Sequence, residues 1–539
     1  MTVTVSHRRS AVAAEGGALT GTGILLRLAL RRDRIKLPAW TLGVSVMAAY
    51  FALVVPKLRP EADILEAGRA LMELPLMQVF SGPLFGLDNA DKSTFLMLAF
   101  VVEFQLLAAV VNILLVARHT RAEEQTGRAE LVRAAVVGRH ASLTAAFLVA
   151  VVTDVVMALL LTLTGVAVGL PAGSAALFGV GTAVFGLVFA GVTAVTVQLT
   201  RHSKAACGIA SGVLFLVWTL RAVGAVQDVR GGWATWLTPM GWSLLTRVLD
   251  EERWWPLALS VLLTAVLLAS AYRLSARRDL GAGLMPVRPG PARATARLRS
   301  PFALALRLQR ASFYGWGIGL AVVGLLFGGL AGAMRVTGTA AGTGSGPDMV
   351  DGFLSLTVNF LSWLVSILMV MSVVRARNDE VRGLVTPLLA TPTSRPAWLG
   401  STLLVAALAA VGLLALSGLA AGVSAASALG DGGLVWEVAG MTLARAPESL
   451  VVLAVAAALF GLAPRILVGA WVVIGYGGVA RFWGTNLPDW LLALSPFNHI
   501  PRMPVEDFRL MPLVTLSAAA VLLVLAALYG FRRRDLDSA

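Results

Sequence analysis

Long apolar stretches separated by short polar ones set the pattern of this chain. Runs of roughly 20 apolar residues recur along it, long enough to cross a hydrocarbon core of about 30 Å as an α-helix. They predict about twelve membrane spans, near residues 38–56, 93–117, 141–166, 175–199, 206–226, 256–273, 313–334, 353–374, 397–422, 441–462, 466–483 and 512–530. The expected fold class is therefore an all-α polytopic membrane protein.

The polar segment after the second span of each half has the same sequence features. Residues 118–140 and 375–396 both follow an apolar run. Four residues recur at a constant spacing of 256: Arg121, Glu124, Gly127 and Arg139 match Arg377, Glu380, Gly383 and Arg395. Four matches at one spacing indicate a tandem duplication, so we expect two pseudo-symmetric six-helix halves.

A basic stretch before the first span is also repeated. Residues 24–36, ILLRLALRRDRIK, have the spacing of an amphipathic helix that lies on anionic headgroups. Its match in the second half lies 276 residues later: Arg31, Arg34, Trp40 and Gly43 correspond to Arg307, Arg310, Trp316 and Gly319. The larger spacing predicts roughly 20 extra residues in the first half, in the outer segment around 57–92.

The duplication gives a domain organisation. We expect a flexible tail (1–22), a first half (23–273), a cytoplasmic linker (274–300), a second half (301–530) and a C-terminal tail (531–539). The repeated polar segments read as short amphipathic surface helices, each with charged sequence, a glycine and a small apolar cluster. A solvated loop is the alternative for either segment alone, and their repetition favours a paired role.

Composition and charge support a membrane protein. The chain is 57% hydrophobic and 14% charged, with mean hydropathy +0.80, whereas soluble domains carry about 25% charged residues. The net charge of +14 comes from cations concentrated in the segments expected inside, which is a topological bias rather than a nucleic-acid surface. An apolar signal segment is missing from residues 1–20, and both termini are expected in the cytoplasm of a bacterial cell, with the chain in its plasma membrane.

Several polar groups fall within predicted spans. Glu103 and Phe104 match Asn359 and Phe360 at the spacing of 256. We expect them to face a substrate path, with Asp154 as a further candidate, although buried hydrogen-bonded braces are the alternative. Arg445 and Glu448, three residues apart, are expected to pair. The glycines of the seventh span, Gly315, Gly319, Gly324, Gly328 and Gly332, predict that another helix packs closely against them. Close packing of this kind at the seam between the halves is what a sliding interface would use.

The outer segments before the last span of each half also match. Residues 227–255 and 483–512 both contain tryptophan and a Leu-(Thr/Ser)-Pro step. Such sequence cannot cross lipid, but it can dip into the membrane and return when protein shelters it. An interfacial helix with an aromatic belt explains the segments equally well.

No catalytic or cofactor motif is recognisable in the sequence. The chain has no G-x-x-x-x-G-K-[ST] phosphate loop and no G-x-S-x-G motif. Its five histidines lack metal-ligand spacing, and the single cysteine, Cys207, excludes an intramolecular disulfide. We therefore expect no enzyme activity and no cofactor on this chain.

The stretch from Glu380 to Arg395, E-x-x-G-x-x-x-x-L-L-A-T-P-x-S-R, resembles the cytoplasmic loop after the second span of ABC-2-type exporter permeases. In that family the loop is a coupling helix that docks on an ATPase subunit. The first copy differs where Arg133–Gly138 replace the A-T-P-x-S segment. The linker 279–294, DLGAGLMPVRPGPARA, and the double length resemble permeases identified as polyketide-antibiotic exporters.

The resemblance implies an ATP-driven multidrug or antibiotic exporter with the ABC-2-type exporter fold. Its partners would be two copies of a separate ATP-binding-cassette ATPase subunit, which carry ATP and Mg, together with the lipid bilayer and a small lipophilic substrate. The coupling residues it implies are Arg121, Glu124, Gly127, Arg128, Glu130, Arg139, Arg377, Glu380, Gly383, Leu388, Leu389 and Arg395. The outer gate it implies consists of re-entrant helices with Trp236, Pro239, Trp242, Pro496 and Phe497.

Two other functions fit parts of the sequence. A proton-driven secondary antiporter built from parallel repeats would need titratable membrane groups, and Glu103 or Asp154 could serve. The long polar segments after the second and eighth spans, and the replacement of both acids in the other half, disfavour it. A membrane scaffold that docks partners without transporting anything is the third possibility.

Overall fold

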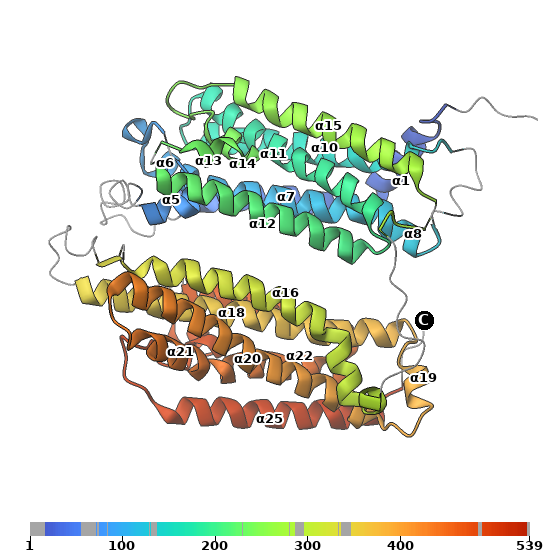
Figure 1. Cartoon of the computed structure of the whole chain (residues 1–539), viewed down its shortest axis with the longest axis vertical. Helices are drawn as coiled ribbons and strands as arrows, with labels where there is room; N and C mark the ends of the chain where they lie inside the picture. The colour runs from blue at the N-terminus through green and yellow to red at the C-terminus, as the bar shows by residue number, and fades with distance from the viewer. Residues whose placement is uncertain are drawn as a thin grey trace, which may run out of the picture. The chain divides into compact units, whose positions relative to one another are not determined.

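The computed structural model is all-helical over the part of the chain that it describes. It describes residues 17–54, 72, 75–83, 85–128, 130, 137–228, 230–279, 281–285, 296–332, 334–335, 346–482 and 488–535. Contacts divide the chain into two compact units, unit 1 (Met1–Pro289) and unit 2 (Gly290–Ala539), which are described separately (Figure 1). Most of the predicted N-terminal tail, residues 57–71 of the extra outer segment, and 286–295 of the linker lie outside the described residues.

Unit 1 consists of long helices with short helices at both ends. They are α1 (Thr22–Arg32), α2 (Lys36–Ala49), α5 (Pro75–Ser81), α6 (Lys92–Ala99), α7 (Val101–Ala117), α8 (Glu123–Gln125), α10 (Ala141–Ala167), α11 (Ala172–Leu199), α12 (Ser203–Gln227), α13 (Trp233–Trp236), α14 (Pro239–Leu244) and α15 (Trp255–Arg277). Two π-helical stretches, η1 (Tyr50–Val54) and η3 (Arg118–Ala122), extend α2 and α7. Figure 1 places α1 and α8 at one end of the unit, and α5 and α6 at the other.

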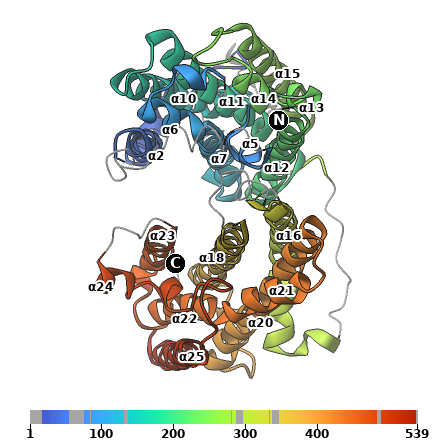
Figure 2. The ribbon, with the colours of Figure 1, turned by 90° about the vertical axis from the view of Figure 1, so that its left-hand side faces the viewer.

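The core of unit 1 forms around α11. This helix packs against α7, α10, α12 and α15, and it lies among α7, α10 and α14 in the end-on view of Figure 2. Its sequence is rich in glycine and alanine, so neighbouring backbones come close. A Cβ added to Gly179 would lie 2.5 Å from the carbonyl oxygen of Ala158 on α10. Between the glycines, Phe178, Phe185 and Phe189 fill the interior.

Unit 2 repeats this plan with different helix lengths. Its helices are α16 (Pro301–Gly329), α18 (Gly346–Val381), α19 (Thr386–Leu389), α20 (Arg395–Leu429), α21 (Leu434–Ala444), α22 (Ala446–Leu462), α23 (Gly469–Phe482), α24 (Asp489–Leu492) and α25 (Leu510–Arg533). Within the unit α22 packs against α18, α20 and α25 (Figure 2). A short 3-10 helix, η7 (Pro496–Asn498), follows α24.

Eleven helices within the described residues are long and apolar enough to cross a membrane, which confirms the polytopic all-α fold. The eleventh predicted span, 466–483, corresponds to α23, whose 14 residues fall short of that length. Its counterpart in unit 1, α12, has 25 residues. The tenth span begins earlier than predicted because α21 and α22 meet at Arg445, and Leu434–Leu462 acts as one candidate span.

The predicted interfacial helices differ between the units. In unit 1 the chain turns after α1, and Asp33 at this turn binds Arg118 Nη2 and His119 Nε2, each at 2.7 Å. In unit 2 the residue at the matching position, Gln309, lies inside α16, which runs unbroken from Pro301 into the span. The stretch predicted as a second interfacial helix is therefore the first part of α16, a helix that bends along its length in Figure 1.

The second part of the glycine stripe of the seventh span packs closely against α20 within unit 2, in agreement with the predicted close helix packing. A Cβ added to Gly328 would lie 2.0 Å from the Ala421 carbonyl oxygen on α20, and one added to Gly324 would lie 2.5 Å from that of Ser417. Added Cβ atoms at Gly315 and Gly319 would meet no described atom within 4 Å. The close approach of α16 to α20 thus depends on the second part of the stripe.

This difference gives a matched test of the helix pairing. Gly328→Ala should destabilise the protein by about 1–3 kcal/mol, because the new methyl group forces two backbones apart. Gly319→Ala on the same helix should leave stability unchanged or raise it slightly, because alanine favours helix at an open position. Thermal unfolding in detergent, followed by the monodisperse fraction, would measure both. Equal melting temperatures for the two variants would contradict the described packing.

Candidate functional site

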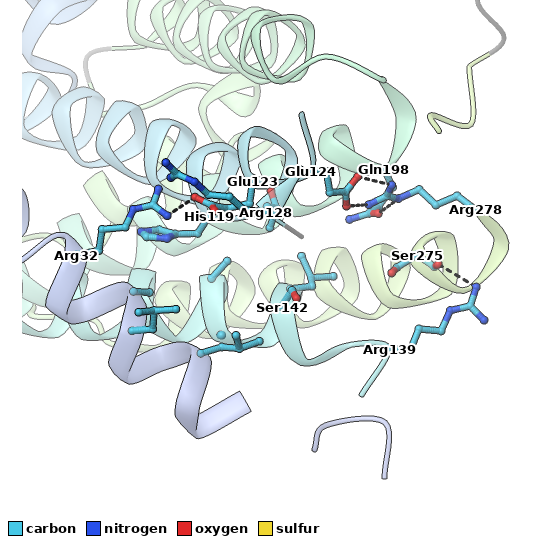
Figure 3. Close-up of a pocket in the computed structure, with 17 residues that line it drawn as sticks. Arg32, His119, Glu123, Glu124, Arg128, Arg139, Ser142, Gln198, Ser275 and Arg278 are labelled. Carbon is cyan, nitrogen blue, oxygen red and sulfur yellow. Dashed lines mark hydrogen bonds and ion pairs between the residues drawn. The ribbon is translucent and has the colours of Figure 1, made fainter. Parts of the chain in front are cut away.

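The predicted coupling residues of unit 1 gather around one carboxylate. Arg121, on the π-helical extension of α7, is buried, and its Nε and Nη2 donate to the carbonyl oxygen of Val197 at 3.0 and 2.5 Å. Its Nη1 donates to Glu124 Oε2 at 2.6 Å. On the other side of Glu124, Arg278 donates to Oε1 at 2.5 Å and to Oε2 at 2.9 Å. Figure 3 shows Glu124 facing Arg278 and Gln198.

The same arrangement recurs in unit 2. Arg377 donates to Glu380 Oε2 at 3.2 Å, and Arg534 donates to that oxygen at 2.7 Å. The guanidinium of Arg534 also lies over the rings of Phe460 and Phe531, 5.0 and 4.9 Å from their centroids. Arg278 and Arg534 are 256 residues apart, the spacing that already relates Arg121 to Arg377. We call each set, Arg121–Glu124–Arg278 and Arg377–Glu380–Arg534, an arginine–glutamate cluster.

Each cluster ties the segment after the second span to the exit of the last span. Both bonds to the second arginine join residues 154 positions apart. A second tie runs parallel to it: Arg139 Nη2 donates to the carbonyl oxygens of Ser275 and Ala276, and Arg395 Nη1 donates to those of Arg532 and Arg534. Charge-assisted hydrogen bonds of this kind are stronger than those between neutral groups. We therefore expect the segment after the second span and the end of the last span to move as one body within each unit.

The glycine of each predicted coupling loop ends the helix that carries the glutamate. Gly127 and Gly383 have φ of 73° and 70°, in the left-handed region that other residues enter at a cost. Their amides donate to the carbonyl oxygens of Glu124 and Glu380 at 3.2 and 2.8 Å. The chain therefore turns at the same point in both units.

Beyond these glycines the chain presents exposed side chains. Arg128 and Glu130 are exposed in unit 1, where residues 129 and 131–136 lie outside the description. In unit 2, Leu384 is 55% exposed, and Leu388 and Leu389 are half-buried on α19. The repeated arginines and glutamates thus hold the loop from inside, and the residues that follow them face outward.

The polar residues of the spans lie in separate surroundings. Asp154 is buried between α7, α10 and α11, where Asn112 Nδ2 donates to its Oδ1 at 2.9 Å. Gly186 on α11 makes room for this pair, since a Cβ there would lie 2.7 Å from Asn112 Nδ2. Asp154 Oδ2 is buried and has no hydrogen-bond partner among the described residues, so both the substrate-path role and the brace stay predictions.

Glu103 lies near the start of α7, whereas Asn359 lies well inside α18. Glu103 Oε2 is buried and has no hydrogen-bond partner among the described residues. Phe104 beside it is buried against Phe178, with ring centroids 5.8 Å apart. In unit 2, Asn359 Nδ2 donates to the Ser355 carbonyl oxygen at 2.6 Å, and Phe360 stacks on Phe327 at 5.3 Å. Their part in a substrate path remains a prediction.

The outer-gate candidates sit on short helices at the bundle ends. Trp236 ends α13, and its ring centroid lies 5.5 Å from that of Trp255, on which it stacks. The indole Nε1 of Trp242 donates to the carbonyl oxygen of Trp236 at 2.6 Å. Pro239 begins α14 and is buried. In unit 2, Pro496 begins η7, and Phe497 lies so close to Gly477 of α23 that a Cβ there would be 2.4 Å from the ring. Both segments pack on their own bundle.

Two arginines inside apolar helices hold neighbouring chain segments. The predicted pair of Arg445 and Glu448 is confirmed, with 2.7 Å between Nη1 and Oε1, and both side chains are buried. Arg445 also donates to the carbonyl oxygens of Ile500 and Pro501 at 3.3 and 2.8 Å. Sequence reasoning missed Arg221, which is buried in α12. Its guanidinium donates to the carbonyl oxygens of Gln78 and Val79 at 2.8 and 2.7 Å. A cation within an apolar run was the signal for it.

The described residues contain no group of three or more His, Cys, Asp or Glu that could hold a metal ion. The site offers a carboxylate clamped by guanidinium groups, buried backbone ties and an outward-facing loop. Within each unit it joins the loop after the second span to the end of the last span.

Comparisons with known proteins identify relatives of the chain. The family described as "Multidrug efflux system permease Rv1217c, C-terminal domain" matches residues 25–273 and 298–532, most of the chain. The multidrug efflux system permease protein Rv1217c of Mycobacterium tuberculosis is 38% identical over 545 residues, which cover 96% of each protein.

The clusters predict a specific loss of stability. Arg278→Ala or Arg534→Ala should each lower the free energy of unfolding by about 1–3 kcal/mol, because a mostly buried carboxylate loses a charged donor. Arg277→Ala, which removes an exposed arginine next to Arg278, should change it by less than about 0.5 kcal/mol. Thermal unfolding of the purified protein would compare them. Equal melting temperatures for Arg278→Ala and Arg277→Ala would exclude a stabilising cluster.

Proposed function

We infer that this chain, which belongs to the family of the multidrug efflux system permease Rv1217c, is the membrane-spanning permease of an ABC-2-type exporter. It moves lipophilic drugs, antibiotics or lipids out of the cell. The energy comes from ATP hydrolysed with Mg on two copies of a separate ATPase subunit, one docked on each loop that follows an arginine–glutamate cluster. The chain itself is a transport subunit.

The observation that carries this proposal is the pair of arginine–glutamate clusters with exposed residues just beyond them. A loop that only joins two spans does not need a buried arginine–glutamate cluster to hold it. Since both units have such a cluster, we infer that a partner exerts force on each loop. When a partner moves the loop, the cluster passes the displacement to the end of α15 or α25 and, through Arg121 and Val197, to α11. Closure of two ATPase subunits would thus reorient whole helices.

Charge and motif content support the division of labour. The chain has no phosphate loop to hold ATP, so the nucleotide belongs to the partners. The positive-inside bias supports a cytoplasmic position for both termini and both clusters, where ATP is available. An apolar, permissive cavity suits lipophilic cargo, which needs few directional contacts.

Docking can be tested at one exposed position. Leu384→Asp should abolish stimulation of the partner ATPase, or reduce it at least about tenfold, because it places a carboxylate on the apolar docking surface. Gly432→Asp adds a carboxylate to the exposed turn between α20 and α21, at the other end of α20, and should leave stimulation unchanged.

The measurement is ATP hydrolysis by the product of an adjacent ATPase gene, reconstituted with each permease variant in lipid. Both variants should elute as folded monodisperse protein, so that a lost interaction is separated from a lost fold. Full stimulation by Leu384→Asp would rule out docking at this loop.

The proton-driven alternative is tested by Asp154→Asn. The amide keeps an acceptor for Asn112 and cannot carry a proton, so an ATP-driven permease should retain efflux within about twofold. Efflux of a fluorescent lipophilic cation from cells that express the chain with its ATPase would measure this. A proton-coupled carrier that uses Asp154 would lose drug efflux, and efflux without any ATPase partner would overturn the proposal.

A further inference from the structure

Each unit has a cavity at the end that carries its arginine–glutamate cluster. The cavity of unit 1 lies between α1, the extension of α7, the start of α10 and the end of α15, and it has a volume of about 110 Å³ (Figure 3). The cavity of unit 2 lies between α16, α18 and α20 and has a volume of about 30 Å³. We call them the unit 1 cavity and the unit 2 cavity.

The two cavities are equivalent within the duplication. Leu28 and Ala29 line the first where Leu304 and Ala305 line the second, at the spacing of 276. Glu123 corresponds in the same way to Asp379 at the spacing of 256. The difference in volume therefore reflects side chains that changed after the duplication.

One pair of matching positions differs strongly in side-chain size. Ser142 lines the unit 1 cavity, and Trp398 stands at the matching position of the unit 2 cavity. The indole of Trp398 lies 5.5 Å from the ring of Phe531, which replaces Ser275. In unit 2 two aromatic rings thus occupy the place where unit 1 has two serines and open space.

Among the described residues that line the unit 1 cavity, arginines outnumber carboxylates. Of the four arginines, Arg32 is paired with Glu123, and Arg278 with Glu124. Within the described part of the chain, Arg139 binds backbone carbonyl groups and no carboxylate. Arg128 forms no hydrogen bond or ion pair with any residue that the structure describes, and its counterpart in unit 2 is the exposed Leu384. The remaining cavity group able to carry charge, His119, is bound to Asp33.

The wall of the cavity is a helix suited to a bilayer surface. On α1, Ile24 and Leu28 are 73% and 56% exposed, and Arg27 and Arg31 on the same helix are also exposed. A helix with this pattern lies at the boundary between headgroups and acyl chains. The cavity therefore opens beside apolar side chains that acyl chains can cover.

We propose that the unit 1 cavity binds the phosphate group of an anionic phospholipid, which enters beside α1 and contacts Arg128 through charge-assisted hydrogen bonds. Basic pockets between membrane helices suit such headgroups. The unit 2 cavity, filled by Trp398, does not bind one. The site makes the two halves unequal in their contact with the membrane, and it does not depend on the proposed ATPase partners.

The duplication supplies the test variants. Ser142→Trp and Arg128→Leu each place in unit 1 the residue that unit 2 already carries at that position. Arg31→Leu removes an exposed cation of α1 that does not line the cavity and serves as the control. Native mass spectrometry of the purified full-length chain, titrated separately with phosphatidylglycerol, phosphatidylcholine and sodium phosphate, would measure the first molecule bound.

We expect wild type to retain phosphatidylglycerol in preference to phosphatidylcholine, and both cavity variants to bind it about tenfold more weakly. Arg31→Leu should bind as wild type does. Because Arg128 is exposed, Arg128→Leu keeps the test valid even if Ser142→Trp fails to fold. Equal retention by wild type and Arg128→Leu would overturn the site, and saturation by sodium phosphate at similar concentrations would assign it to a soluble anion and not to a lipid.

Discussion

A carboxylate held between two arginines is the constraint on which the arrangement of each unit depends. Glu124 and Glu380 each sit where a membrane helix leaves the bundle, and each is reached by an arginine from its own helix and by another from the end of the last span. Breaking one side of such a mostly buried contact leaves an uncompensated charge, so the three residues are retained together. The duplication preserved this contact even where surrounding helices changed length.

In each unit a buried arginine within the apolar helices binds backbone at the end away from the arginine–glutamate cluster. Arg221 donates to the carbonyl oxygens of Gln78 and Val79 in the last turn of the short helix α5, and Arg445 donates to those of Ile500 and Pro501, which lie outside the helices. The last carbonyl groups of a helix, like backbone without regular structure, need partners from elsewhere in the protein. A guanidinium with five donors meets that need without a second folded element, which explains why these cations lie inside otherwise apolar helices.

Much of the architecture could be predicted from sequence, because span length and the repeat spacing are local signals. The partners Arg278 and Arg534 were readable at the same spacing of 256, but nothing local shows that a residue 154 positions away closes the cluster. The burial of Arg121 and Glu380 could not be predicted either, since charged residues in a polar loop ordinarily face water. The stripe at Gly324 and Gly328 indicated close packing, yet the identity of its partner, α20, depends on tertiary geometry.

The unequal cavities bear on why the halves share one polypeptide. In a transporter assembled from two identical subunits, any substitution appears twice, so a serine in one subunit cannot be replaced without the same replacement in the other. Fusion removes that symmetry rule: Trp398 could accumulate in one copy while Ser142 persisted in the other. A single gene then encodes two halves of common descent, and selection can change the residues of one half while the other keeps the ancestral residues.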